Sequence, residues 1–181
     1  MTALHFVDAN VFLYASSDNE PVKQARARAW LEHLWQEERG RTSIQVLSEY
    51  HVNLKKRSGQ RVPDQEAWAR VAKYLAWKPQ PVDETLFRQA REVEQRWRIS
   101  WWDSMVVAAA QMQYCDLLLT EDLQDGMKFG SVTVRSPFTL EVREAAANYA
   151  VAYAETRRTA SPHRPRGRPR RPTTSRTPAP G

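Results

Sequence analysis

The chain alternates short apolar segments with longer segments in which apolar residues recur every three or four positions. Continuous apolar runs bounded by polar residues are typical of buried strands, and they occur at residues 4–7, 117–119 and 132–134. Shorter candidate strands lie at residues 41–43 and 81–82. Segments with helical periodicity separate these strands, which predicts an α/β protein with a parallel sheet.

Helical spacing predicts six helices within this alternation. Pro21 favours the first position of one helix, and Gly40 and Gly59 follow the ends of two. Asp64 and Asp83 are expected to be N-caps. The predicted helices cover residues 10–15, 21–38, 44–58, 64–78, 83–98 and 101–114.

Length and composition suggest one domain followed by a tail. A chain of 181 residues that is 41% hydrophobic can bury one core of ordinary size, expected within residues 1–138. The alanine-rich residues 139–156 are expected to form a further helix at the surface or at an interface. Residues 157–181 are rich in Arg and Pro and have few aliphatic side chains to offset the entropy of ordering, so we expect a disordered tail.

The net charge of +6 belongs to this tail. Residues 156–181 contain eight arginines and no acid, which leaves 19 basic and 21 acidic side chains in residues 1–155, a net charge of −2. The tail is therefore either an arm attracted to phosphates or a dispensable extension.

Membrane and redox functions are not expected. No apolar run approaches the ~20 residues of a membrane span, and the N-terminus lacks the features of a signal peptide, so a cytoplasmic protein is expected. The single cysteine, Cys115, precedes an apolar strand and is expected to pack in the core.

Four acidic residues stand at the edges of apolar segments: Asp8, Glu49, Asp103 and Asp122. Asp8 and Asp122 follow predicted strands, and ligands in open α/β sheets collect at the carboxyl ends of strands. Each acid also has a purely structural interpretation. Asp8 can cap a helix, Glu49 can be solvated, and Asp103 can complete a capping box with Ser100.

Together the four acids predict one metal site. Two carboxylates about 4 Å apart repel by roughly 4 kcal/mol at an effective dielectric constant near 20, so a cluster needs protonation or a divalent cation. Oxygen ligands favour Mg²⁺ or Mn²⁺, and no histidine or cysteine pattern with metal-ligand spacing competes. Which acid of the turn after residue 120 points inward, Glu121, Asp122 or Asp125, stays open at this stage.

Four motifs in order resemble the motif set of PIN-domain ribonucleases, in particular the VapC toxins of bacterial toxin–antitoxin pairs. They are residues 6–15 (FVDANVFLYA), 45–50 (QVLSEY), 102–110 (WDSMVVAAA) and 119–126 (LTEDLQDG). No single motif is specific, but the ordered set is. The resemblance spans about residues 3–138 and departs from the family at Ser136, where the family more often has asparagine before Pro-Phe.

The resemblance implies a three-layer α/β/α fold with a short central parallel sheet, and a Mg²⁺- or Mn²⁺-dependent endoribonuclease acting on single-stranded or loop RNA. It assigns catalysis and metal binding to the acidic quartet. Asp8 and Asp103 would bind the ion directly, and the other two acids would bind it or orient its waters. Asn10 would support the first aspartate, and Asp125 would assist.

The resemblance also implies partners. Relatives usually form homodimers and are inhibited by an antitoxin protein, so RNA, a cognate antitoxin and a second copy of the chain are expected. Because residues 1–155 are nearly neutral, contact with the RNA backbone needs local positive charge. The candidates, which are otherwise a solvated helix end, are Lys55, Lys56, Arg57 and Arg61.

The tryptophans are interpreted mainly as core. Trp30, Trp68 and Trp77 occupy apolar helical positions and are expected to pack between helices. Three others lie near Asp103, and one of them can flank a substrate groove or an antitoxin interface, although core packing is preferred: Trp97, Trp101 and Trp102.

Two alternatives remain. One is a non-catalytic module: either a degenerate PIN fold that binds RNA or protein, or a phospho-receiver. A receiver predicts paired acids after the first strand and a lysine after the last, whereas the chain has Asp8 and Arg135 there. The other is a DNA-directed nuclease with the same metal chemistry, although no duplex-reading motif is evident.

Overall fold

The computed structural model describes residues 3–56, 62–140 and 142, so the expected tail at 157–181 and nearly all of the expected helix at 139–156 lie outside the described residues. The strands are β1 (His5–Val7), β2 (Gly40–Arg41), β3 (Leu117–Leu119), β4 (Lys128–Phe129) and β5 (Val132–Arg135). The helices are α1 (Ala9–Ala15), α2 (Pro21–Gln36), α3 (Ile44–Lys56), α4 (Asp64–Ala72), the 3₁₀ helix η1 (Lys73–Trp77), α5 (Glu84–Trp97) and α6 (Trp101–Met112). None of these helices is long and apolar enough to cross a bilayer.

The five strands form one sheet in the order β2-β1-β3-β5-β4. The pairs β1–β2, β1–β3 and β3–β5 are parallel, and only the short β4 runs antiparallel to β5. In the register of β1 and β3, Val7 lies opposite Leu119. The two strands therefore end at the same edge of the sheet, and the residues after them are neighbours in space.

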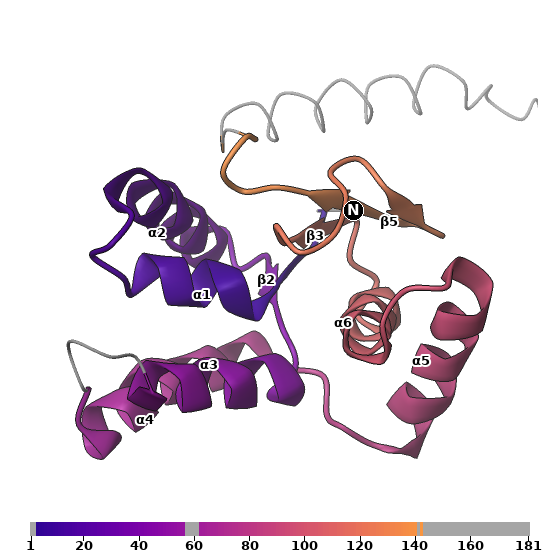
Figure 1. The fold of residues 1–181 in the computed structure, drawn as a ribbon, viewed down its shortest axis with the longest axis horizontal. Helices are drawn as coiled ribbons and strands as arrows, with labels where there is room; N and C mark the ends of the chain where they lie inside the picture. Colours follow the sequence, from indigo (N-terminus) through magenta and orange to yellow (C-terminus); the bar gives the residue numbers. More distant parts are fainter. Residues whose placement is uncertain (1–2, 57–61, 141, 143–181) are drawn as a thin grey trace, which may run out of the picture.

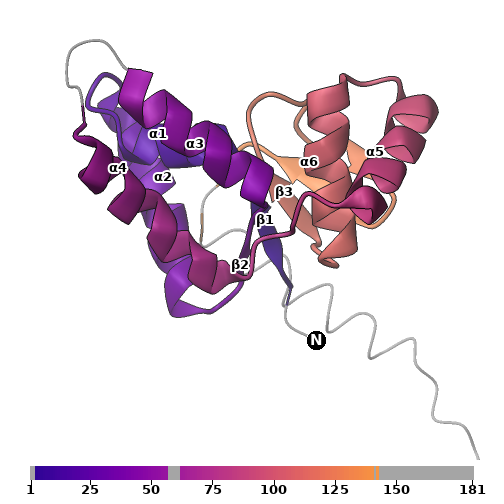
Figure 2. The same ribbon diagram turned by 90° about the horizontal axis from the view of Figure 1, so that it is seen from below.

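Helices cover both faces of the sheet. Figure 1 shows α1 to α4 on one side and α5 and α6 on the other, and the view in Figure 2 agrees. Within each layer, α1 packs on α2 and α3, while α5 packs on α6. The predicted three-layer α/β/α fold with a short, mainly parallel sheet is confirmed.

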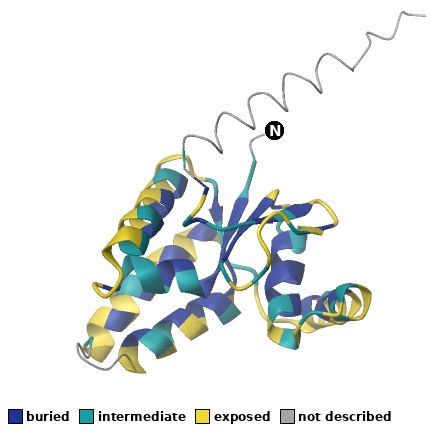
Figure 3. Cartoon of the chain, turned by 45° about the horizontal axis from the view of Figure 1, so that its top comes forward, coloured by how far each residue is buried: buried dark blue, intermediate teal, exposed yellow. Residues whose placement is uncertain are grey.

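The core lies along both faces of the central strands, as the buried residues in Figure 3 show. Because helices cover both faces, every residue of β1 and β3 is buried instead of every second one, and Phe6, Val7, Leu118 and Leu119 are fully buried. Cys115 is also buried, as expected.

The structure differs from the predicted elements in three places. Residues 81–82 form no strand, and the chain makes only an isolated bridge there, between Ser43 and Gln80. The two-residue strand β4, with the exposed Lys128, was not predicted because its sequence carries no apolar run. Asp64 does not cap α4, since Pro63 holds the N-cap position without a side-chain hydrogen bond. The Asp64 carboxylate instead pairs with Lys55.

Candidate active site

Asp8 stands where β1 ends and α1 begins, and its carboxylate makes one contact to each side. Oδ1 accepts a hydrogen bond from the Ala9 amide at 2.7 Å, which caps α1. Oδ2 accepts from the Thr120 hydroxyl at 2.8 Å, just beyond the end of β3. The side chain is only 8% exposed. Asp8 therefore caps α1, and the same geometry holds its carboxylate at the edge of the sheet where β1 and β3 end.

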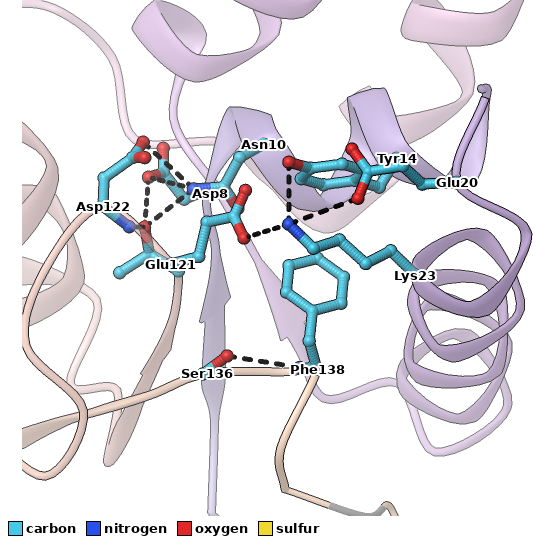
Figure 4. A network of polar contacts seen from close by, with 10 residues as sticks. Asp8, Asn10, Tyr14, Glu20, Lys23, Glu121, Asp122, Ser136 and Phe138 are labelled. Atoms are coloured by element: carbon cyan, nitrogen blue, oxygen red, sulfur yellow. Dashed lines mark hydrogen bonds and ion pairs between the residues drawn. The ribbon is translucent and has the colours of Figure 1, made fainter.

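Asn10, in the first turn of α1, links the two strand ends. Its Nδ2 donates to Thr120 Oγ1 at 2.9 Å and to Asp122 Oδ2 at 3.0 Å, with a longer contact to Asp8 Oδ2 at 3.4 Å. Figure 4 shows these contacts converging on the amide. The arrangement agrees with the expected role of Asn10 as support for the first aspartate.

The turn after Thr120 contains three acids, and they point in different directions. Asp122 faces Asn10 and Asp8, whereas Glu121 turns to Lys23, whose Nζ lies 2.8 Å from Glu121 Oε2 (Figure 4). Asp125 lies further along the turn and accepts from the Ser136 amide at 2.7 Å and from Arg135 Nε at 3.2 Å. Asp122 is the acid of this turn that faces the site.

Asp103 and Glu49 come from the flanking helices. Asp103 lies in the first turn of α6, where its amide donates to Ser100 Oγ at 3.1 Å and the Ser100 hydroxyl donates to Asp103 Oδ2 at 2.6 Å. Ser100 is thus the N-cap of α6, which is one half of the expected capping box, and its hydroxyl holds one carboxylate oxygen of Asp103 at the helix start. Glu49 projects from the middle of α3 and is exposed.

All four acids line one open cleft of about 650 Å³. The other residues of its wall are Gln45, Ser48, Val52, Asn53, Lys56, Val82, Trp102 and Val106. A second hollow of about 630 Å³, between α2, α3 and η1, contains none of the four acids. The structure thus joins acids that are up to 114 positions apart in the chain, the separation of Asp8 and Asp122.

Comparison with known proteins agrees with this architecture. The sequence model of the PIN domain matches residues 5–124, about two thirds of the chain. This chain belongs to the PIN-domain family. The crystal structure of VapC20 from Mycobacterium tuberculosis, described as a sarcin-ricin loop cleaving toxin, is 21% identical, covers 63% of this chain and 86% of its own, and superposes with a TM-score of 0.48. No curated protein matches the chain.

The carboxylates of this PIN domain interact electrostatically. Burial raises the pKa of Asp8 from 3.8 to about 7, and the nearby carboxylates of Asp122 and Glu49 add to the rise, although the hydrogen bonds from Thr120 and Ala9 oppose it. The pKa of Glu49 is also raised, first by partial burial in the cleft and then by Asp122 and Asp103. Negative charge in this cleft is therefore costly without a compensating cation.

The donor set fits a hard divalent cation, because it consists of carboxylate oxygens with no thiolate or imidazole. As the side chains stand, no three acidic, histidine or cysteine groups among the described residues are close enough to hold one ion. Asp8 is fixed by its hydrogen bonds, whereas Asp122 and Glu49 are exposed and can rotate toward it. That rotation is what three of these carboxylates need in order to share one ion.

Two features of the cleft were not predicted from sequence. Thr120 is buried and bonds both Asp8 and Asn10, and its only sequence signal is its position at the end of an apolar strand. Trp102, for which core packing was preferred over a place beside a substrate groove or an antitoxin interface, is 67% exposed and lines the cleft. It lies in the first helical turn, before α6 meets the sheet, so no layer covers it.

The other tryptophans divide by layer. Trp30 and Trp77 are buried as predicted, and Trp97 packs edge to face against Phe129. Trp68 was expected to pack between helices but is 57% exposed, because the short α4 lies at the outside of its layer. Sequence periodicity identifies the apolar positions of a helix without showing whether another layer covers them.

The basic residues proposed for RNA contact are also separated. Lys56 lines the cleft, whereas Lys55 pairs with Asp64 on the adjacent helix. Arg57 and Arg61 lie outside the described residues. Lys56 is thus the member of this group that the structure brings to the acids.

Proposed function

We propose that this PIN domain is a divalent-metal-dependent endoribonuclease. One observation carries the proposal: Asp8, Glu49, Asp103 and Asp122 arrive from four separate segments and line the same cleft. A structural network of acids would be neutralised by basic partners, but the nearest contacts of Asp8 and Asp122 are hydroxyl and amide groups. Such a cluster is suited to a cation.

The four carboxylates would hold a Mg²⁺ or Mn²⁺ ion. When bound, such an ion lets water act as a nucleophile at neutral pH and stabilises charge on the scissile phosphate. The protein supplies the preorganisation. The Thr120 hydroxyl and the Ala9 amide fix the Asp8 carboxylate, Asn10 aims Asp122 at the same point, and Ser100 anchors Asp103. Lys56 can neutralise a phosphate at the cleft wall.

The biological role follows from the motif resemblance to VapC toxins. We propose that the protein is the toxin of a toxin–antitoxin pair, acts in the cytoplasm on RNA, forms a homodimer and is inhibited by a cognate antitoxin. The ordered motifs at residues 6–15, 45–50, 102–110 and 119–126 support this role.

The test is cleavage of cellular RNA by purified protein with Mg²⁺ or Mn²⁺, compared with excess chelator. Asp8→Asn keeps a side chain that can cap α1, so the fold should survive while cleavage falls by at least about a hundredfold. Asp103→Asn should behave in the same way. Glu84→Gln is the control, because that acid pairs with Arg88 on the exposed surface of α5 and does not line the cleft.

Metal-dependent fragments that disappear in Asp8→Asn and persist in Glu84→Gln support the nuclease. RNA that stays intact with folded wild-type protein, free of antitoxin, would favour the non-catalytic binding module instead. A DNA substrate of the same sequence in a parallel reaction separates RNA cleavage from DNA cleavage.

A further inference from the structure

The cleft that contains the acids has a second, apolar wall. Three of its side chains are large, apolar and exposed: Trp102 at 67%, Val82 at 48% and Val52 at 44%. They come from α6, from the segment before α5 and from α3, so three separate elements contribute to the same surface. Leaving an apolar side chain of this size in water forgoes burial energy, and a contiguous exposed patch of this kind marks a binding surface.

Trp102 differs from its neighbours in what its ring contacts. The Trp101 ring packs edge to face against Phe87 at 5.0 Å, and the Trp97 ring packs against Phe129 at 5.4 Å. Among the described residues, no aromatic ring packs against the Trp102 indole. The indole is therefore available to a ligand.

The placement of Trp102 relates it to the acids. Trp102 and Val106 are four residues apart in α6 and share a face, with Asp103 beside them, and all three line the cleft. Lys56 stands in the same cleft and makes no ion pair with any described residue. A flat apolar surface, a free cation and a cluster of carboxylates suited to a metal ion occur together, and a nucleotide matches all three through its base and its phosphate.

We propose that Trp102, backed by Val52 and Val82, is the platform on which an unpaired base of the RNA substrate stacks beside the acidic site. This inference rests on the proposed function and names a residue that positions the RNA at that site. In a duplex, both faces of a base are covered by neighbouring bases, so stacking on an indole requires a base that is unstacked. The platform thus selects single-stranded or loop segments, and because every base has a π-face it tolerates many sequences.

The experiment measures RNA binding separately from cleavage. The full chain, with Ca²⁺ as the divalent ion, is titrated into a short single-stranded oligoribonucleotide carrying 2-aminopurine, whose fluorescence is quenched by stacking. Wild type is compared with Trp102→Ala, Trp102→Phe and the control Trp68→Ala, an exposed tryptophan on α4 outside this cleft. A duplex of the same sequence is the second probe, and thermal unfolding confirms that each variant folds.

We expect Trp102→Ala to bind the single strand about tenfold or more weakly and to lose the quenching, since one base stacked on an aromatic ring contributes about that much. Trp102→Phe should retain most of the affinity and most of the quenching, and Trp68→Ala should match wild type. All the proteins should have the same affinity for the duplex. The platform is overturned if Trp102→Ala binds and quenches like wild type, or if no protein binds the single strand. It is also overturned if the substitution changes only the oligomeric state or the capture of a protein partner.

The failures of this inference and of the nuclease are distinguishable. Cleavage that depends on Asp8 but has an unchanged KM in Trp102→Ala would keep the nuclease and remove the platform. Single-strand binding that depends on Trp102, without metal-dependent cleavage, would keep the platform and remove the nuclease.

Discussion

The Thr120 hydroxyl makes three hydrogen bonds within the site. It donates to Asp8 and accepts from Asn10 Nδ2 and from the Asp122 amide at 3.1 Å. One buried oxygen therefore sets the relative positions of two carboxylates from different strands. Its role depends on burial and on the register of β1 and β3, neither of which a single sequence reveals.

Replacing Thr120 with valine tests this role. The valine has the same shape but leaves Asp8 Oδ2 without its hydroxyl donor in a buried position, so the free energy of unfolding should fall by about 1–3 kcal/mol. Cleavage should fall with it, because the Asp8 carboxylate loses its hydroxyl donor and the Asp122 backbone amide loses its acceptor. Thr120→Ser keeps the hydroxyl and should stay within about 1 kcal/mol of wild type in chemical denaturation. Equal losses in both variants would show that the methyl group, and not the hydroxyl, is what matters.

His5 at the start of β1 should make stability depend on pH. Burial lowers its pKa from 6.5 to about 4, with the charges of His33 and Arg39 adding to the shift. Between these values the unfolded chain binds a proton that the folded chain does not, so stability is complete above about pH 6.5 and is lost as the pH falls toward 4. The full shift of the His5 pKa corresponds to about 3 kcal/mol in the free energy of unfolding.

Urea unfolding of wild type and His5→Gln at pH 7.5 and pH 4.5 measures this contribution. Between the two pH values, the free energy of unfolding should fall by about 2–3 kcal/mol less in the variant than in wild type, because the variant lacks the contribution of His5. The titration of the carboxylates is common to both proteins and cancels in this comparison. Parallel losses in the two proteins would mean that His5 is protonated in the folded state.

At the scale of elements, α1 and α2 are tied to the turn after β3 through Lys23. Its Nζ contacts Glu121 Oε2 at 2.8 Å and Tyr14 OH at 3.0 Å, and it lies 4.3 Å from the centroid of the Tyr14 ring. These contacts hold Glu121 away from the cleft while the next residue, Asp122, faces it. The ion pair thus keeps a fifth carboxylate out of the acidic site.

Lys23→Met should therefore release Glu121 and lower the cleavage rate about fivefold, in proportion to the modest energy of a partly exposed ion pair. Glu121→Gln alone should have little effect. The double variant should recover the wild-type rate, because the neutral glutamine needs no counter-charge. If the double variant is as slow as Lys23→Met, then Lys23 acts through packing on Tyr14 instead.

The contact between β2 and η1 limits which side chains can replace Gly40 in β2. A Cβ atom on Gly40 would lie 2.5 Å from the ring atoms of Trp77, which is itself buried. Gly40→Ala should therefore destabilise the fold by about 1–3 kcal/mol, measured by thermal or denaturant unfolding. Adding Trp77→Leu should relieve the clash, so the double variant should be less destabilised than the sum of the two single variants. Strict additivity would argue against a direct clash.

Sequence patterns predicted the long elements more accurately than the short ones. The periodic helices at residues 21–38, 83–98 and 101–114 were placed to within about two residues of α2, α5 and α6, because each has a long apolar face and clear end signals. The false strand at 81–82 and the missed β4 involve two residues each, too few to show a period. The acids were found because each interrupts or borders an apolar run. The exposure of Trp102 was not, because it depends on where the layers end.

At the scale of the whole molecule, charge separates the domain from its C-terminal extension. Residues 1–155 carry a net charge of −2, and the positive charge lies in the arginines beyond them. A chain truncated after residue 156 should unfold at an unchanged temperature and cleave a short RNA at the full-length rate. The truncated chain should bind RNA without the salt-dependent contribution of the arginines. Its affinity for RNA should therefore fall less steeply with increasing salt concentration than that of the full chain. A lower unfolding temperature would show that the extension is part of the fold.

The strand order has a consequence for synthesis of the chain. β1 lies between β2 and β3 in the sheet, so Asp8 leaves the ribosome early but meets the Thr120 hydroxyl only after more than a hundred further residues have been translated. No nascent fragment shorter than about two thirds of the chain contains all four acids. If the protein cuts RNA as proposed, the ribosome and messenger that produce it meet a complete active site only after Asp122 and the strand before it have left the ribosome.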